Sequence, residues 1–79
     1  MTRSSFLYQL KTNGIDTSLV SFYPNLRDGY CVRKNRCGWT VFVLERGLEY
    51  DSMGFPSESD ALHYLFKQLL SLYGNNISM

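Results

Sequence analysis

The chain has few of the side chains on which catalysis and metal binding depend. It contains one histidine, His63, and two cysteines, Cys31 and Cys37. A catalytic histidine needs a nucleophile and an orienting partner, and nothing at a fixed spacing from His63 supplies them. A structural zinc site takes four Cys or His ligands, and the sequence is one short. The sequence therefore predicts a protein that is not an enzyme, with no catalytic residue and no metal site.

Glycine-rich segments and long apolar runs are also missing. Gly38, Gly47 and Gly54 each stand alone in a turn, so we find no phosphate-binding loop and expect no cofactor. No apolar run approaches the roughly 20 residues of a membrane span. The first residues, MTRSSFLYQL, lack the apolar stretch of a signal peptide. We expect a cytoplasmic protein with free thiols and no membrane partner.

Charge of one sign is not in excess. The net charge is +1, from eight basic and seven acidic residues, which argues against attraction of the whole chain to nucleic acid. Basic residues gather within residues 27–36 and acidic ones within residues 45–60. A bipolar surface suits a protein partner, although a solvated loop and an acidic helix start would give the same pattern.

The composition is that of one small folded domain over residues 1–79, with a loose tail at about 75–79. Hydrophobic residues make up 44% of the 79 positions and aromatic residues 15%, whereas disordered chains are depleted in both. A core this small cannot enclose all twelve aromatic side chains. Exposed aromatic side chains are typical of a binding surface.

The middle of the chain predicts an antiparallel meander. Residues 30–34 and 39–44 are β-prone and are joined by a turn at residues 35–38. A second turn at residues 45–47 leads to a third strand at residues 48–53. Residues 39–44, WTVFVL, are apolar at nearly every position, which indicates a central strand buried on both faces or nearly so.

The first of these turns also predicts a register. It pairs Lys34 with Trp39 and places Cys31 opposite Phe42. Cys37 then lies in the turn, out of register with Cys31, so a disulfide is not expected. We expect Cys31 to be buried and Cys37 to lie in a loop.

A short helix and an edge strand are expected before the meander. Ser4 or Ser5 is expected to cap the helix, which carries apolar residues at helical spacing and stops at Asn13 and Gly14. The segment at residues 19–23 then predicts a short edge strand.

A longer helix follows the meander, with Ser57 as its expected cap and an end near Gly74. Its apolar stripe consists of Ala61, Leu62, Leu65, Phe66, Leu69, Leu72 and Tyr73. We expect Trp39 and Phe66 to be core residues. The predicted fold is α+β: a three- to four-stranded antiparallel meander packed against this C-terminal amphipathic helix, with the short N-terminal helix at one end.

One segment combines charge with an aromatic side chain and is the predicted partner-binding site. It consists of Glu45, Arg46, Glu49, Tyr50 and Asp51. Charge complementarity around aromatic or arginine anchors is typical of fast, tight protein association. Alternation places Glu49 and Asp51 on one face of the third strand, as an acidic ridge or as the solvated face of a sheet.

An alternative is a small nucleic-acid-binding regulator. The first hairpin interleaves aromatic and basic residues, as single-strand binders do: Tyr30, Arg33, Lys34, Arg36 and Trp39. Two features count against it. Trp39 begins a strongly apolar strand, which favours a core position, and the acidic segment would repel phosphate. A domain that only oligomerises is a third interpretation, and homodimerisation stays open.

Two runs of sequence resemble a family of small bacterial immunity proteins. They are GWTVFVLERG at residues 38–47 and FPSESDALHYL at residues 55–65. The similar pattern is a tryptophan-led strand, an E-R-G turn, a third strand, and F-x-S-E before an amphipathic helix with aromatic residues. Members are typically encoded beside polymorphic or contact-dependent growth-inhibition toxins. The resemblance implies that this chain neutralises a cognate toxin, often a nuclease, by covering the active site or substrate surface of the toxin domain.

Overall fold

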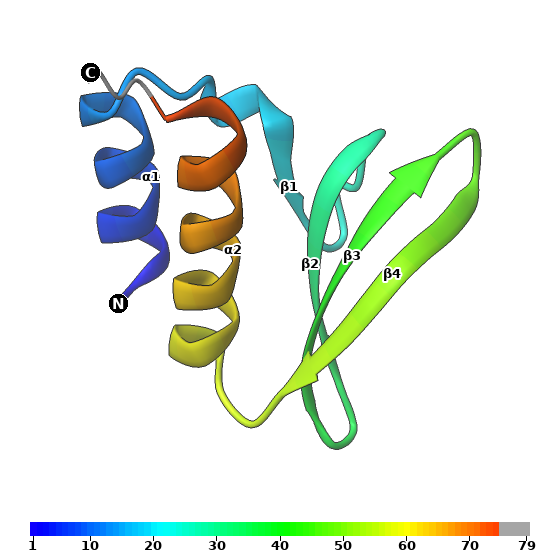
Figure 1. Ribbon diagram of the computed structural model, residues 1–79. Helices are drawn as coiled ribbons and strands as arrows, with labels where there is room; N and C mark the ends of the chain where they lie inside the picture. Colours follow the sequence, from blue (N-terminus) through cyan, green and yellow to red (C-terminus); the bar gives the residue numbers. More distant parts are fainter. Residues whose placement is uncertain (75–79) are drawn as a thin grey trace.

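Two helices lie on the same side of a four-stranded sheet (Figure 1). The computed structural model describes residues 1–74, so the predicted loose tail at 75–79 lies outside the described residues. The elements in chain order are α1 (Arg3–Thr12), a 3-10 helix (Thr17–Leu19), β1 (Val20–Phe22), β2 (Gly29–Asn35), β3 (Gly38–Glu45), β4 (Leu48–Phe55) and α2 (Glu58–Tyr73). The predicted α+β class is confirmed. Neither α1 nor α2 is long and apolar enough to cross a membrane.

The sheet has the order β1-β2-β3-β4, and its last three strands form the predicted antiparallel meander. The predicted register is confirmed, because Lys34 pairs with Trp39 and Cys31 with Phe42. The first strand is an edge strand as expected, but it runs parallel to β2, with Val20 paired to Tyr30. The expectation that every strand would be antiparallel is therefore wrong for β1.

The reason for the parallel pairing lies in the connection between β1 and β2. The buried Ser21 hydroxyl accepts a hydrogen bond from the Arg27 backbone N–H at 3.0 Å. The Cys31 thiol donates to the Arg27 carbonyl oxygen at 3.3 Å. These contacts hold the connection against the sheet, so the chain returns to the starting end of β1 before β2 begins.

Helix α1 begins two or three residues earlier than the sequence indicated. Its N-cap is Thr2, not Ser4 or Ser5. The Thr2 hydroxyl accepts from the Ser5 N–H at 3.1 Å, and the Ser5 hydroxyl accepts from the Thr2 N–H at 3.2 Å. This reciprocal capping box satisfies two backbone donors at once, which a cap at Ser4 or Ser5 would not do. The helix buries Phe6 and Leu10.

Helix α2 begins and ends where the sequence predicted. Ser57 is its N-cap and accepts from the Asp60 N–H at 3.1 Å, and Gly74 is its C-cap. Four residues of the predicted stripe are buried against the sheet and α1, namely Ala61, Leu62, Leu65 and Leu69. Leu72 and Tyr73 belong to the same stripe but are 61% and 49% exposed. The end of α2 therefore presents apolar side chains to solvent.

The core lies between the helices and the sheet. Its fully buried side chains include Phe6, Leu62 and Leu65. Trp39 and Phe66, which we expected inside, are only partly buried and pack against the core from its margin. Trp39 lies at the end of the sheet, where its β4 partner is Phe55, itself partly buried.

Strand β3 is buried on both faces at its centre, as its composition predicted. Val41 contributes to the core under the helices, while Phe42 is completely buried on the opposite, back face of the sheet. The Arg33 guanidinium lies 4.5 Å from the centre of the Phe42 ring and covers it. Cys31 is also buried and Cys37 is exposed, both as free thiols, which confirms the two predictions for the cysteines.

A candidate protein-binding groove

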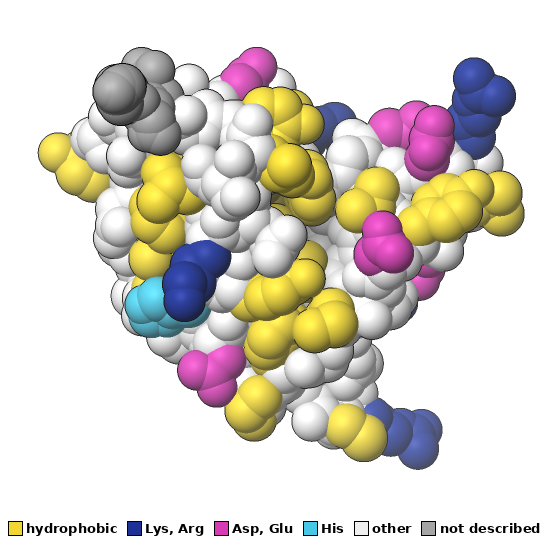
Figure 2. Space-filling view, viewed as in Figure 1, with side chains coloured by type: hydrophobic (Ala, Val, Ile, Leu, Met, Phe, Trp, Pro, Cys, Tyr) yellow, Lys and Arg dark blue, Asp and Glu magenta, His cyan; other side chains and the backbone are white. Residues whose placement is uncertain are grey.

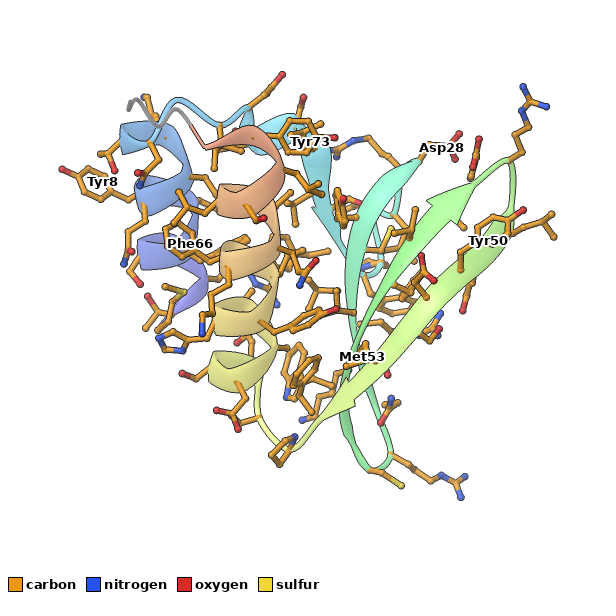
Figure 3. The ribbon with its side chains drawn as sticks, in the orientation of Figure 1. Tyr8, Asp28, Tyr50, Met53, Phe66 and Tyr73 are labelled. Carbon is orange, nitrogen blue, oxygen red and sulfur yellow. The ribbon has the colours of Figure 1, made fainter. Side chains whose placement is uncertain are left out.

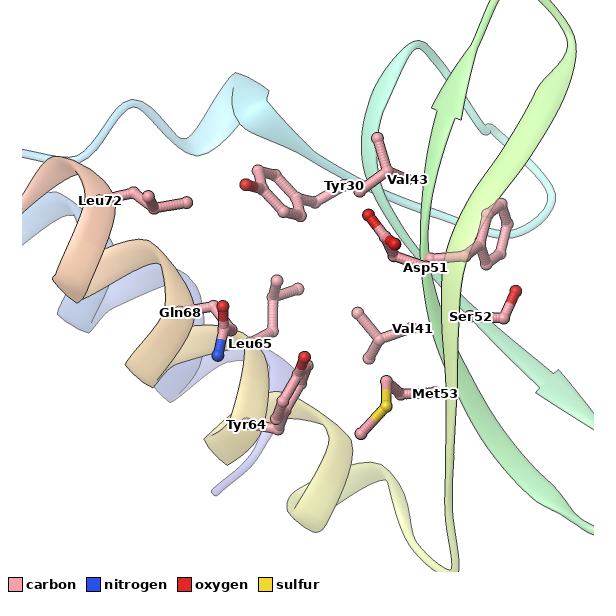
Figure 4. A pocket seen from close by; sticks show the side chains of 11 residues that line it. Tyr30, Val41, Val43, Asp51, Ser52, Met53, Tyr64, Leu65, Gln68 and Leu72 are labelled. Carbon is pink, nitrogen blue, oxygen red and sulfur yellow. The ribbon is translucent and has the colours of Figure 1, made fainter.

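The β3–β4 hairpin diverges from α2 and leaves an open hollow between them, which we call the α2–β4 groove (Figures 2 and 4). Its volume is about 590 Å³. The apolar side chains that line it are Val41, Val43, Met53, Leu65 and Leu72. Figure 2 shows hydrophobic side chains on both sides of the hollow. The groove thus offers an apolar surface to a partner without any rearrangement of the fold.

Polar groups converge on the same groove from three elements. Tyr30 comes from β2, Asp51 from β4, and Tyr64 and Gln68 from α2. The Asp51 side chain points toward Tyr30 (Figure 4). Burial raises the pKa of the Tyr30 hydroxyl, and Tyr73, Tyr64 and Asp51 add to this rise through their charges. A tyrosine hydroxyl is neutral near pH 7, so Tyr30 can donate a hydrogen bond into the groove.

A β-bulge in β4 turns Asp51 into the groove. Val41 pairs with Met53, but Val43 pairs with Tyr50, so one extra residue stands on β4 between these pairs. Asp51 has a positive φ of 54° there. A bulge shifts the alternation of side chains by one residue. The expectation that Glu49 and Asp51 share one face is therefore wrong, because it assumed unbroken alternation.

Glu49 lies on the back face and has a partner of its own. Its carboxylate is 2.9 Å from the Arg33 guanidinium, in a two-bonded ion pair next to Phe42. The hydrogen bond from Arg33 holds the pKa of Glu49 below its ordinary value, and the same bond raises the pKa of Arg33. The ion pair therefore links β4 to β2 across the intervening strand β3.

The other predicted partner-binding residues lie along the β3–β4 hairpin. Glu45 ends β3, and Arg46 is in the turn with a positive φ of 53°. Tyr50 is 45% exposed on β4 (Figure 3). Of the five residues, only Asp51 lines the groove. The structure thus divides the predicted segment between the turn, the back face and the groove.

Sequence reasoning missed the groove residues contributed by α2. Tyr64, Gln68 and Leu72 recur every fourth residue, which places them along one side of a helix. That spacing was the available signal. Leu72 was interpreted instead as part of the apolar stripe, which does not include Tyr64 or Gln68.

The hairpin of the nucleic-acid alternative does not form one surface. Tyr30 lines the groove and Trp39 packs against the core on the helix side of the sheet. Arg33 lies on the back face, paired with Glu49. The sheet thus separates Arg33 from the aromatic groups Tyr30 and Trp39, whereas Lys34 pairs with Trp39.

Within residues 1–74, no three His, Cys, Asp or Glu side chains come together as metal ligands. His63 is exposed, as the sequence predicted, and its Nδ1 lies 3.1 Å from the Ser59 carbonyl oxygen of the same helix. No family model, curated protein or solved structure matches this chain.

Proposed function

We propose that this chain is a cytoplasmic immunity protein that binds a cognate bacterial toxin and blocks its active site or substrate surface. The sequence resemblance of residues 38–65 suggests the class of partner, and a nuclease toxin domain is the form that it suggests. Inhibition by binding requires a contact surface and no reacting groups. The protein then acts without being an enzyme.

The observation that carries the proposal is the gathering of exposed apolar side chains about the α2–β4 groove. Tyr50 and Met53 of β4 are each 45% exposed, and Leu72 and Tyr73 of α2 are 61% and 49% exposed. Aromatic residues and methionine are enriched in the buried centres of protein interfaces. Of these four, Met53 and Leu72 line the groove itself. Exposed apolar patches mark interaction sites on soluble proteins.

The free edge of β4 adds a second means of contact. β4 is the last strand of the sheet and pairs only with β3 among the described residues. The outer backbone groups of an edge strand can pair with a strand of another protein. A partner seated in the groove would lie beside this edge and could use both.

The test is capture of the partner by the tagged full-length chain from its native host, followed by a high-salt wash and mass spectrometry. We expect one stoichiometric protein whose growth-inhibitory activity is silenced when this chain is added. An interface with an apolar centre should survive the wash, whereas binding through phosphates weakens steeply with salt. Recovery of RNA or DNA that leaves with salt, and of no protein, would contradict the proposal.

Two matched variants locate the interface. Tyr50→Ala should weaken partner binding by at least about tenfold, because exposed aromatic anchors at an interface are frequent hot spots. Tyr8→Ala should leave binding unchanged, because Tyr8 is 67% exposed on α1, at the opposite side of the molecule (Figure 3). The reverse pattern would place the interface on α1 and not on the groove.

A further inference from the structure

The groove contains one charged group, and its own chain does not neutralise it. Asp51 is the only charged residue among those that line the groove. Within residues 1–74 its carboxylate forms no ion pair and accepts no hydrogen bond. The other acidic residue of β4, Glu49, is paired with Arg33. Of the two carboxylates of β4, the one unpaired among the described residues, Asp51, therefore faces the groove.

No basic residue of the chain stands ready to pair with Asp51. Arg33 is engaged with Glu49 on the back face, and Arg46 lies in the β3–β4 turn. Lys67 is on α2 but does not line the groove. The sequence after Lys67 contains no lysine or arginine. A cation at Asp51 has to come from another molecule.

The walls of the groove suit a cation with an apolar stem. Tyr30 and Tyr64 present aromatic rings from opposite sides, and Asp51 lies on the third side (Figure 4). Aromatic faces attract ammonium and guanidinium groups, most strongly where water is partly excluded. Leu65 and Val41 provide the apolar floor that the methylene groups of a long side chain cover.

The backbone at Asp51 supports a specific role for this carboxylate. A φ of 54° is costly for a residue other than glycine, and Asp and Asn are among the side chains that tolerate it best. Such conformations persist where the surrounding structure holds them, and they cluster at binding sites. Here the bulge that produces it also aims the side chain at Tyr30.

We propose that the α2–β4 groove binds an arginine or lysine side chain of the partner protein, with Asp51 as the counter-charge and Tyr30 and Tyr64 as the aromatic walls. The source of that side chain rests on the proposed function, because a toxin bound there would supply it. The groove's preference for a cation does not depend on which partner supplies it.

The test is a ¹H–¹⁵N NMR titration of the full chain with two cationic probes, Nα-acetyl-argininamide and Nα-acetyl-lysinamide. We expect saturable shifts at the amides of Asp51, Ser52 and Gln68. The neutral probe Nα-acetyl-citrullinamide has nearly the shape of the arginine probe, and we expect it to bind about tenfold more weakly, the usual range for loss of one charge-assisted bond.

Two variants, each of which removes one negative charge from β4, complete the experiment. Asp51→Asn should weaken the arginine probe about tenfold and keep the fold, because asparagine also tolerates a positive φ. Glu49→Gln removes the same charge from the back face and should leave probe binding unchanged. Equal binding of the citrulline probe, or unchanged binding to Asp51→Asn, would overturn the cation site.

The result of the NMR titration can be distinguished from the result of the partner-capture test of the proposed function. A captured toxin together with no groove shifts would overturn the cation site alone. Groove shifts that require Asp51, without any captured protein, would support the cation site and overturn the proposed function.

Discussion

At the scale of single residues, the β3–β4 hairpin holds the two non-glycine residues with positive φ among residues 1–74, Arg46 and Asp51. Arg46 and Gly47, with φ of 53° and 83°, form the two-residue turn. Both values match the type of turn whose twist suits adjoining antiparallel strands. The positive φ of Arg46 therefore allows the tight turn of the hairpin. Asp51 lies within β4, where its positive φ directs the side chain into the groove.

A titration of stability separates the two carboxylates of β4. The folded-state pKa of Glu49 lies below its ordinary value of 4.5, because Arg33 donates to it. The ion pair therefore stabilises the fold above that ordinary pKa, and this stabilisation is lost as pH falls through the lower, folded-state pKa. In urea unfolding from pH 7 to pH 3, Glu49→Gln should be less stable than the native chain near neutrality, and the difference should shrink below about pH 4.5.

Glu45→Gln is the control, because Glu45 forms no ion pair within residues 1–74. This variant keeps the Arg33–Glu49 pair, so its stability should fall toward pH 3 as that of the native chain does. The pKa of Asp16 is also lowered, by the Ser18 backbone N–H, and this contribution is common to all three proteins. A Glu49→Gln difference that stays constant to pH 3 would show that the ion pair does not form in solution.

At the scale of elements, the start of α1 offers a direct comparison of two caps. Thr2→Ala should cost about 1 kcal/mol of unfolding free energy, because it removes the side chain that accepts from the Ser5 N–H. Ser4→Ala should be neutral or slightly stabilising, because Ser4 is exposed within the helix and alanine is the better helix former. Chemical denaturation followed by circular dichroism measures both. If Ser4→Ala lowers the free energy of unfolding more than Thr2→Ala does, then Ser4 caps the helix, as the sequence suggested.

The elements also show how far the sequence could be interpreted. Turn length determines register in a hairpin, so the pairing of Cys31 with Phe42 followed from one correctly placed turn. The direction of β1 could not be predicted, because a three-residue strand carries no pattern and the decisive contacts come from the connection to β2. The bulge was missed for a related reason. Aspartate tolerates a left-handed conformation better than most residues, but one aspartate in a strand pattern does not predict it, and alternation gives no warning of an inserted residue.

The groove was beyond sequence reasoning because it depends on how β4 and α2, which are consecutive in the chain, diverge in space. The apolar stripe of α2 is longer than the part of the helix that the sheet and α1 cover, so its last residues remain exposed. The sequence of the stripe alone does not show which of its residues are covered by the sheet and α1. The predicted binding segment contained one residue of the groove, Asp51, chosen for its charge and not for its place in the fold.

At the scale of the whole molecule, one layer of helices on one face of the sheet must supply most of the stability. A chain this short buries only about 60% of its unfolded surface, so its margin of stability is thin. Arg33 and the β1–β2 connection shield the back face, where no helix of residues 1–74 lies (Figure 1). The last residues of the α2 stripe, Leu72 and Tyr73, are exposed. We therefore expect them to contribute little to the stability of the fold.

Two leucines of α2 test this division between stability and binding. Leu62 is fully buried in the core, whereas Leu72, ten residues later on the same helix, is 61% exposed at the groove. Leu62→Ala should lower the free energy of unfolding by about 2–5 kcal/mol, because it leaves a cavity that the neighbours cannot fill. Leu72→Ala should change it by less than about 0.5 kcal/mol, as surface substitutions usually do. Urea unfolding measures both variants, and affinity for the captured partner is measured on Leu72→Ala, where we expect a loss. If Leu72→Ala instead destabilises the fold as Leu62→Ala does, the end of α2 belongs to the core and the groove is not a free surface.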